Sequence, residues 1–196
     1  MDKAVMDKED LRRSMLKARL MIEPNDTAEM SKVITQKLLE LDRVRNASCV
    51  MAYCSYKNEP DLMGLVHALL DMGKMVALPY VTGDDSMIAV EYNYESVMKS
   101  NLFGIPEPVI RNESEKVEPD VVLVPGVAFC ENLNRIGYGS GYFDRFLRES
   151  DAFKIGICYD MQVVPSIKAQ PYDVRMDMIV TERRILMPPR DCKPCA

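Results

Sequence analysis

The sequence contains one histidine, no tryptophan and no apolar run long enough to cross a membrane. With His67 as the only imidazole, a histidine-rich metal centre is impossible, and any catalytic triad must use this one residue. His67 lies well off the apolar stripe of its predicted helix at about 100° per residue, so we expect it in solvent. The longest apolar stretch, residues 121–129, is interrupted by Pro125 and Gly126 and is too short to span a bilayer.

An excess of basic residues is also absent. The sequence has 25 Lys and Arg against 30 Asp and Glu, a formal net charge of −5. This balance argues against nucleic-acid or membrane binding through bulk charge, although a local basic patch stays possible. The charged N-terminus lacks the apolar centre of a signal peptide, so we expect a cytoplasmic protein with reduced cysteines. We interpret the first four of the six cysteines as packed thiols.

The composition and periodicity of the 196 residues are typical of one globular domain. Apolar periodicity predicts helices over 8–22, 27–44, 61–72 and 141–150, the second capped by Asp26 or Thr27, and strands over 48–53, 74–79, 87–93, 120–125, 154–159 and 178–182. Alternating strands and helices predict an α/β fold with a layered, largely parallel sheet flanked by helices. We expect one domain over 1–187 and a loose Pro-rich tail over 188–196, which holds Cys192 and Cys195.

The most informative segment is a glycine-rich loop between a buried strand and a helix. Gly137, Gly139 and Gly141 alternate directly before that helix, and Arg135 stands just upstream. Glycines allow positive φ and close backbone approach, and a helix N-terminus offers unpaired N–H groups, so the loop predicts a phosphate cradle. A flexible turn without a ligand is the alternative. The spacing matches neither a Walker loop nor the dinucleotide fingerprint.

Charged residues near this loop and in the first helix add to the prediction. Asp144 falls in the first turn of the following helix, where it could reach a metal bound to the phosphate or simply favour the helix dipole. Lys8, Arg12 and Arg19 share one stripe beside the apolar face of the first helix, whereas Arg13 faces elsewhere. Such cations can point into a cleft. Alternatively, their apolar stems lie along the protein surface while their charged ends stay in water.

Together these segments resemble the 5-formyltetrahydrofolate cyclo-ligase family, whose members are also called methenyltetrahydrofolate synthetases. The resemblance rests on the stripe at 8–19, on PGVAF at 125–129, on NRIGYGSGYFDRFL at 134–147 and on MDMIVTE at 176–182. It implies an ATP- and Mg²⁺-dependent closure of 5-formyltetrahydrofolate to 5,10-methenyltetrahydrofolate, with release of ADP and phosphate. Two alternatives stay open: a member that binds nucleotide or folate without turnover, and an ATP-dependent phosphotransferase acting on another small substrate.

Position by position, the resemblance assigns three groups of residues. ATP would be held by Lys8, Arg12, Arg135, Gly137, Tyr138, Gly139, Ser140 and Gly141, with Arg135 and Tyr142 acting in catalysis. Folate would contact Cys54, Glu59, Phe103, Tyr138, Ser140 and Tyr142, and Mg²⁺ would be held by Asp144 and Asp177. Taken alone, Asp177 resembles a residue that starts a strand, Glu59 a loop acid, and Phe103 and Tyr142 core aromatics.

The sequence departs from the family pattern around the loop. Cys130 and Leu133 stand where relatives have Asp and Gly, so we expect the turn to differ locally. Ser140 replaces Gly or Lys and Phe143 replaces a second Tyr, which affects substrate contacts more than the phosphate site. We expect small molecules as the only partners, with neither nucleic acid nor a membrane. The sequence does not determine the oligomeric state, and a monomer is favoured.

Overall fold

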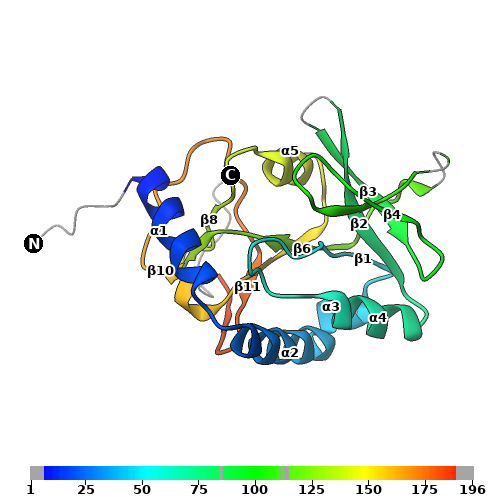
Figure 1. Cartoon of the computed structure of the whole chain (residues 1–196), viewed down its shortest axis with the longest axis horizontal. Helices are drawn as coiled ribbons and strands as arrows, with labels where there is room; N and C mark the ends of the chain where they lie inside the picture. The colour runs from blue at the N-terminus through cyan, green and yellow to red at the C-terminus, as the bar shows by residue number, and fades with distance from the viewer. Residues whose placement is uncertain (1–6, 84–85, 111, 113–114, 189–196) are drawn as a thin grey trace, which may run out of the picture.

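The computed structural model describes residues 7–83, 86–110, 112 and 115–188, and Figure 1 shows the arrangement of their elements. The helices are α1 (Lys8–Leu20), α2 (Pro24–Glu40), α3 (Asp42–Asn46), α4 (Met63–Asp71) and α5 (Tyr142–Arg148), with a 3-10 helix η2 (Asp160–Gln162). The strands are β1 (Cys49–Met51), β2 (Met75–Thr82), β3 (Ser86–Tyr92), β4 (Met98–Ser100), β5 (Pro106–Pro108), β6 (Val121–Pro125), β7 (Ala128–Cys130), β8 (Arg135–Ile136), β9 (Phe153–Ile157), β10 (Val163–Val164), β11 (Met178–Val180) and β12 (Ile185–Leu186). The predicted loose tail, with Cys192 and Cys195, lies almost entirely outside the described residues.

A seven-stranded sheet in the order β12-β11-β9-β6-β1-β2-β3 organises the fold. Its five inner strands run parallel, and β12 and β3 pair antiparallel at the two edges. Every residue of β6 is buried, as expected for a parallel strand covered on both faces. The structure therefore confirms the predicted α/β fold, in which helices flank a largely parallel sheet.

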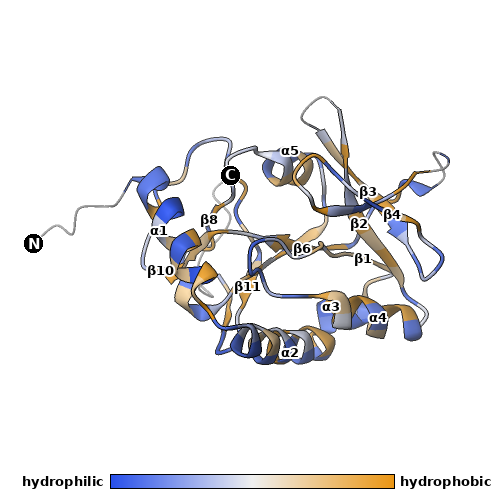
Figure 2. Ribbon diagram, viewed as in Figure 1, coloured by the Kyte–Doolittle hydropathy of each residue, from blue (hydrophilic) through white to orange (hydrophobic). Residues whose placement is uncertain are grey.

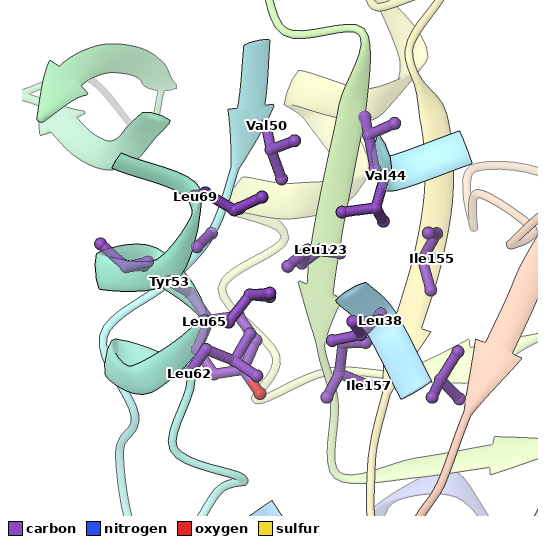
Figure 3. Close-up of a cluster of buried hydrophobic side chains, with 14 of the residues drawn as sticks. Leu38, Val44, Val50, Tyr53, Leu62, Leu65, Leu69, Leu123, Ile155 and Ile157 are labelled. Carbon is purple, nitrogen blue, oxygen red and sulfur yellow. The ribbon is translucent and has the colours of Figure 1, made fainter. Parts of the chain in front are cut away.

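The first face of the sheet is covered by α2, α3 and α4. Figure 3 shows Leu123 and Ile155 of the central strands meeting Leu38 of α2 and Leu65 of α4. All four side chains are fully buried, and burying each contributes about 1.5–3 kcal/mol. Helices α1 and α2 carry both hydrophilic and hydrophobic residues in Figure 2, as amphipathic surface helices do.

The second face is covered by α5 and by β7, which folds back from the carboxyl end of β6. A Cβ atom at Gly126 or Gly156 would lie 2.5 Å from the ring of Phe129, so only glycine lets this ring pack so closely against the turn and the sheet. The chain then enters the small sheet β10-β7-β8. Helix α1 docks there through Leu11, which packs with Ile136, and Figure 1 shows it beside β8 and β10.

The second helix differs from its prediction at both ends. It begins at Pro24, whose fixed φ suits the first helical position, and its N-cap is Glu23, where Asp26 or Thr27 was expected. It ends at Glu40 because the next residue takes an extended conformation with ψ 126°. Six strands of two or three residues, β4, β5, β7, β8, β10 and β12, are absent from the prediction because such short segments carry no periodicity.

The predictions for His67 and for the first four cysteines agree with the structure. His67 is exposed on α4. Cys49, Cys130 and Cys158 are buried free thiols, and Cys54 is a partly buried one. Within the described part of the chain, no helix combines the length and the apolar character that crossing a bilayer requires.

Candidate functional site

The glycine loop at 135–141 and helix α1 meet at the carboxyl end of β6. The Nε–H of Arg12 donates to the carbonyl oxygen of Gly137 at 2.9 Å. Gly139 has a φ of 113°, and a Cβ atom there would lie 3.9 Å from the guanidinium carbon of Arg12. Arg13, the neighbour of Arg12, is exposed. The structure thus brings the predicted stripe of α1 to the predicted loop, where Arg12 contacts the backbone.

Two more guanidinium groups border the same loop. A Cβ atom on Gly137 would lie 3.0 Å from Nη1 of Arg135, and one on Gly141 would lie 2.9 Å from Nη1 of Arg145. Glycines at these positions therefore make room for arginine side chains against the loop backbone. Arg145 is absent from the sequence-based prediction, although its position four residues after Gly141 at a helix start was an available signal. With Arg12, three guanidinium groups surround a loop suited to an anion.

Arg135 and Asp144 form the central ion pair of this site. Nη2 of Arg135 lies 2.8 Å from Oδ2 of Asp144, and their side chains are 4% and 22% exposed. Arg135 also donates to the carbonyl oxygen of Pro125 at 3.1 Å, and Oδ1 of Asp144 accepts from the N–H of Val174 at 3.1 Å. The buried arginine is thus anchored to the end of β6, and Asp144 is held beside the loop.

The two predicted magnesium ligands have different surroundings. Oδ2 of Asp177 accepts from the backbone N–H of Lys154 at 2.8 Å, at the start of β11. Among the residues that the structure describes, no group of three or more His, Cys, Asp or Glu could hold a metal ion. Mg²⁺ often takes only one or two carboxylates together with phosphate oxygens. Asp144 fits that mode beside the loop, and a site shared with Asp177 stays a prediction.

The third cation of the predicted phosphate set and the loop serine have partners of their own. Lys8 forms a partly buried ion pair with Asp173. Ser140 is exposed, and its carbonyl oxygen accepts from Nη2 of Arg145 at 2.9 Å. Lys8 therefore lies on the face of α1 that reaches the loop, but its described contact is with the segment before β11.

A second cluster of charges lies where the loop after β1 meets the glycine loop. The side chain of Glu59 is 3% exposed, and its Oε1 atom lies 3.8 Å from Nη1 of Arg19, which is 1% exposed. Oε2 accepts from the N–H of Tyr56 at 3.0 Å, whereas Oε1 has no hydrogen-bond partner among the described residues. An unpaired buried carboxylate oxygen is costly, so this atom is a candidate for contact with a ligand.

The surroundings of Glu59 also change its ionisation. Burial raises the pKa of Glu59 from 4.5 to about 7, and the charge of Arg19 is the largest of the effects that oppose this rise. The carboxyl group is therefore poised to change its charge near neutral pH. Burial likewise raises the pKa of Cys54, to about 11, so this predicted folate contact is a neutral thiol.

Glu59 borders a polar cleft of about 230 Å³ lined by Thr27, Ala28, Ser31, Ser55, Asn58, Glu59 and Asp61. Oγ of Ser31 donates to the carbonyl oxygen of Thr27 at 2.6 Å and accepts from the N–H of Asp61 at 3.0 Å. A larger cleft of about 390 Å³ lies at the amino ends of β6 and β9, where Asp120 and Phe153 border it. None of the predicted site residues lines the larger cleft, so the smaller one is the functional candidate.

Of the aromatic residues Phe103 and Tyr142, both predicted to contact folate, Phe103 lies outside the core, whereas Tyr142 is partly buried against the cluster on the second face of the sheet. The rings of Phe103 and Tyr142 are 6.4 Å apart in an edge-on arrangement, and Phe103 is 50% exposed. Oδ1 of Asn101 accepts from the N–H groups of Phe103 and Ile105 at 2.9 and 3.0 Å, which fixes the turn between β4 and β5. Core packing therefore does not explain the position of Phe103. Its half-exposed ring instead lies beside Tyr142 of α5.

The segment that leads into the loop has a left-handed backbone at Leu133, a position that is Gly in the family pattern. Leu133 has a φ of 64°, in the left-handed region that favours glycine, and its side chain is fully buried. The N–H of Leu133 donates to the carbonyl oxygen of Cys130 at 2.8 Å, and Cys130 in turn donates to Asn134 at 3.0 Å. The turn therefore keeps a left-handed backbone at the position of Leu133, where the buried leucine side chain holds it, and the expected local difference from relatives stays a prediction.

Comparisons with known proteins agree with this geometry. The profile of the 5-formyltetrahydrofolate cyclo-ligase family matches residues 4–182. A probable 5-formyltetrahydrofolate cyclo-ligase of Schizosaccharomyces pombe is 31% identical over 176 residues, which cover 78% of this chain and 84% of that protein. The 5-formyltetrahydrofolate cyclo-ligase of Escherichia coli is 26% identical over 174 residues, which cover 85% and 96%. The solved structure of Aquifex aeolicus 5,10-methenyltetrahydrofolate synthetase superposes with a TM-score of 0.85 at 30% identity and covers 97% of each chain. The chain therefore belongs to the 5-formyltetrahydrofolate cyclo-ligase family of enzymes.

Proposed function

We propose that the protein closes 5-formyltetrahydrofolate to 5,10-methenyltetrahydrofolate, using ATP and Mg²⁺ and releasing ADP and phosphate. The observation that carries the proposal is the pairing of two unlike subsites. A glycine loop bordered by guanidinium groups suits phosphates, and the unpaired Oε1 of Glu59 suits a ligand that donates hydrogen bonds. Tyr138 joins the two subsites, because it belongs to the loop and its hydroxyl accepts a hydrogen bond from Arg19, the neighbour of Glu59.

The reaction asks for charge neutralisation more than for a protein nucleophile. The formyl oxygen is a poor leaving group, so the γ-phosphoryl group of ATP is transferred to it. N10 of the folate then attacks the formyl carbon and loses its proton, the carbon–oxygen bond breaks, and phosphate leaves. Arg12, Arg135 and Arg145 border the place where the transferred charge would lie, and fixed charges of this kind are usually the largest catalytic contribution. When bound, Mg²⁺ neutralises phosphate charge, and Asp144 would hold it.

Glu59 would recognise the pterin. The amino-pyrimidine edge of a pterin presents paired N–H donors, and an ionised carboxylate accepts from both. Because its pKa is about 7, the carboxyl group is partly ionised at neutral pH, and two donors from a ligand favour the ionised form. Phe103 and Tyr142 would line the path of the folate outside the cleft, where their rings already meet.

A turnover assay tests the proposal. Purified protein is mixed with ATP, Mg²⁺ and 5-formyltetrahydrofolate, and ADP and the methenyl chromophore are followed together. We expect both to appear at equal rates and both to stop when Mg²⁺ is chelated. ADP release that 5-formyltetrahydrofolate does not stimulate would favour the phosphotransferase alternative. Nucleotide and folate binding without either product would favour a member that has lost turnover.

A further inference from the structure

We propose that Arg19 is the positioning residue for Glu59. It holds the turn at residues 56–59 against the glycine loop and leaves the free oxygen of Glu59 as a charged acceptor towards the cleft. The inference rests on the proposed function only in naming folate as the ligand. It also gives Arg19 a role different from the ATP binding expected of Arg12 and Lys8, which lie in the same stripe of α1.

The contacts of Arg19 bind three separate segments together. Nε donates to the carbonyl oxygen of Lys57 at 2.9 Å and Nη1 to that of Gly126 at 3.0 Å. Nη2 reaches the carbonyl oxygen of Tyr56 at 3.4 Å and the hydroxyl of Tyr138. The turn after β1, the end of β6 and the glycine loop thus share one guanidinium group. Because Arg19 is fully buried and its donors face these protein oxygens, it is not placed to bind a phosphate.

The turn that Arg19 holds has an uncommon backbone. Lys57 and Asn58 have φ values of 49° and 57°, a left-handed conformation that non-glycine residues rarely adopt and that persists only where the surroundings enforce it. Nδ2 of Asn58 donates back to the carbonyl oxygens of Arg19 and Ile22 at 3.4 and 3.3 Å. The turn and the end of α1 therefore hold each other, and Glu59 follows directly.

The charge of Arg19 acts on Glu59 without a hydrogen bond, since Nη1 and Oε1 are 3.8 Å apart. This spacing leaves Oε1 free for a ligand while the positive charge still favours the ionised carboxylate. Other titratable groups face Glu59 from the neighbouring segments: Tyr138 and Arg135 of the glycine loop, Tyr53 after β1 and Asp61 before α4. Among the charges that lower the pKa of Glu59, that of Arg19 has the largest effect.

Two substitutions of Arg19 separate charge from position, with the exposed Arg13→Gln as the matched control. Arg19→Gln removes the charge, so we expect the acid limb of kcat/KM for 5-formyltetrahydrofolate, followed as ADP release, to move up by about one pH unit. At pH 7 such a shift lowers the ionised fraction of Glu59 about fivefold. Arg19→Lys keeps the charge but loses the fork of donors. It should keep the acid limb of wild type and raise the folate KM roughly tenfold.

A second readout needs neither substrate. Urea unfolding of wild type and of Glu59→Gln is compared between about pH 5 and 9. Because the pKa of Glu59 is raised in the folded state, wild type loses unfolding free energy as the pH rises towards 7, whereas Glu59→Gln does not. The unfolding free energy of Glu59→Gln relative to wild type should therefore grow with pH and level off near pH 7. When both proteins also carry Arg19→Gln, we expect this stability difference to level off at a higher pH.

The outcomes are distinguishable from a failure of the proposed function. If wild type releases no ADP, the unfolding comparison alone decides the inference. An unchanged levelling point, or an unchanged acid limb in a folded Arg19→Gln, overturns it. If Arg19→Gln does not fold, a folded Arg19→Lys with the folate KM of wild type overturns it, and a raised KM with an unshifted acid limb supports it.

Discussion

The leucine that replaces a glycine before the phosphate loop offers a sharp test of how the loop is held. Leu133→Gly relieves the strain of a left-handed backbone at a non-glycine residue, which should stabilise the folded state by about 1–2 kcal/mol. It also removes a fully buried side chain from the cluster that covers the second face of the sheet. Large-to-small changes in a core cost about 2–5 kcal/mol, and the greater freedom of glycine in the unfolded chain adds about 0.5–1 kcal/mol.

Burial should therefore outweigh strain at this position. We expect Leu133→Gly to lose about 3 kcal/mol of unfolding free energy, measured as a lower midpoint in urea at constant slope. Asn132→Gly, at the exposed neighbouring position, is the control and should change stability little. A stabilised Leu133→Gly would refute this reasoning, because it would mean that the left-handed backbone, and not the buried side chain, dominates the turn.

Four further predictions concern the subsites and the tail. Asp144→Asn should abolish turnover in a folded protein and lower the unfolding free energy by about 1–3 kcal/mol, since it weakens the ion pair with a buried arginine; ADP release within a few fold of wild type would remove the metal role. Arg12→Ala should weaken ATP binding by roughly 1.5–3 kcal/mol and the exposed Arg13→Ala hardly at all, and equal affinities by calorimetry would contradict this. Glu59→Gln should raise the folate KM roughly tenfold while nucleotide affinity stays near wild type; the reverse pattern would place it on the nucleotide side. Removal of residues 188–196 should leave activity and metal content unchanged, because one cysteine pair cannot complete a zinc site, and zinc lost on truncation would argue otherwise.

The central sheet was predictable because its strands are short apolar runs that end at turn residues. Each of the six predicted strands overlaps a strand of the seven-stranded sheet. Periodicity also separated Arg12, which touches the loop, from the exposed Arg13. These signals are local, so the sequence carries them without knowledge of the fold.

Tertiary contacts decided what the sequence could not show. Lys8, Arg12 and Arg19 share one stripe, yet they reach Asp173, the glycine loop and the turn after β1. Helical periodicity places them on one face but does not show which loop lies beneath each turn of the helix. Similarly, burial makes Leu133 tolerate a backbone that its residue type disfavours. The single-domain boundary and the monomeric state stay predictions.

The measurement that tests the central proposal most directly is the simultaneous record of ADP and of the methenyl chromophore with 5-formyltetrahydrofolate as the second substrate. Wild type and Arg13→Gln should form the two products in a one-to-one ratio, and the reaction should cease when Mg²⁺ is chelated or when Asp144 is changed to Asn. ADP formation without the chromophore would contradict the proposed closure of the folate ring, and full activity in the absence of Mg²⁺ would contradict the proposed metal dependence.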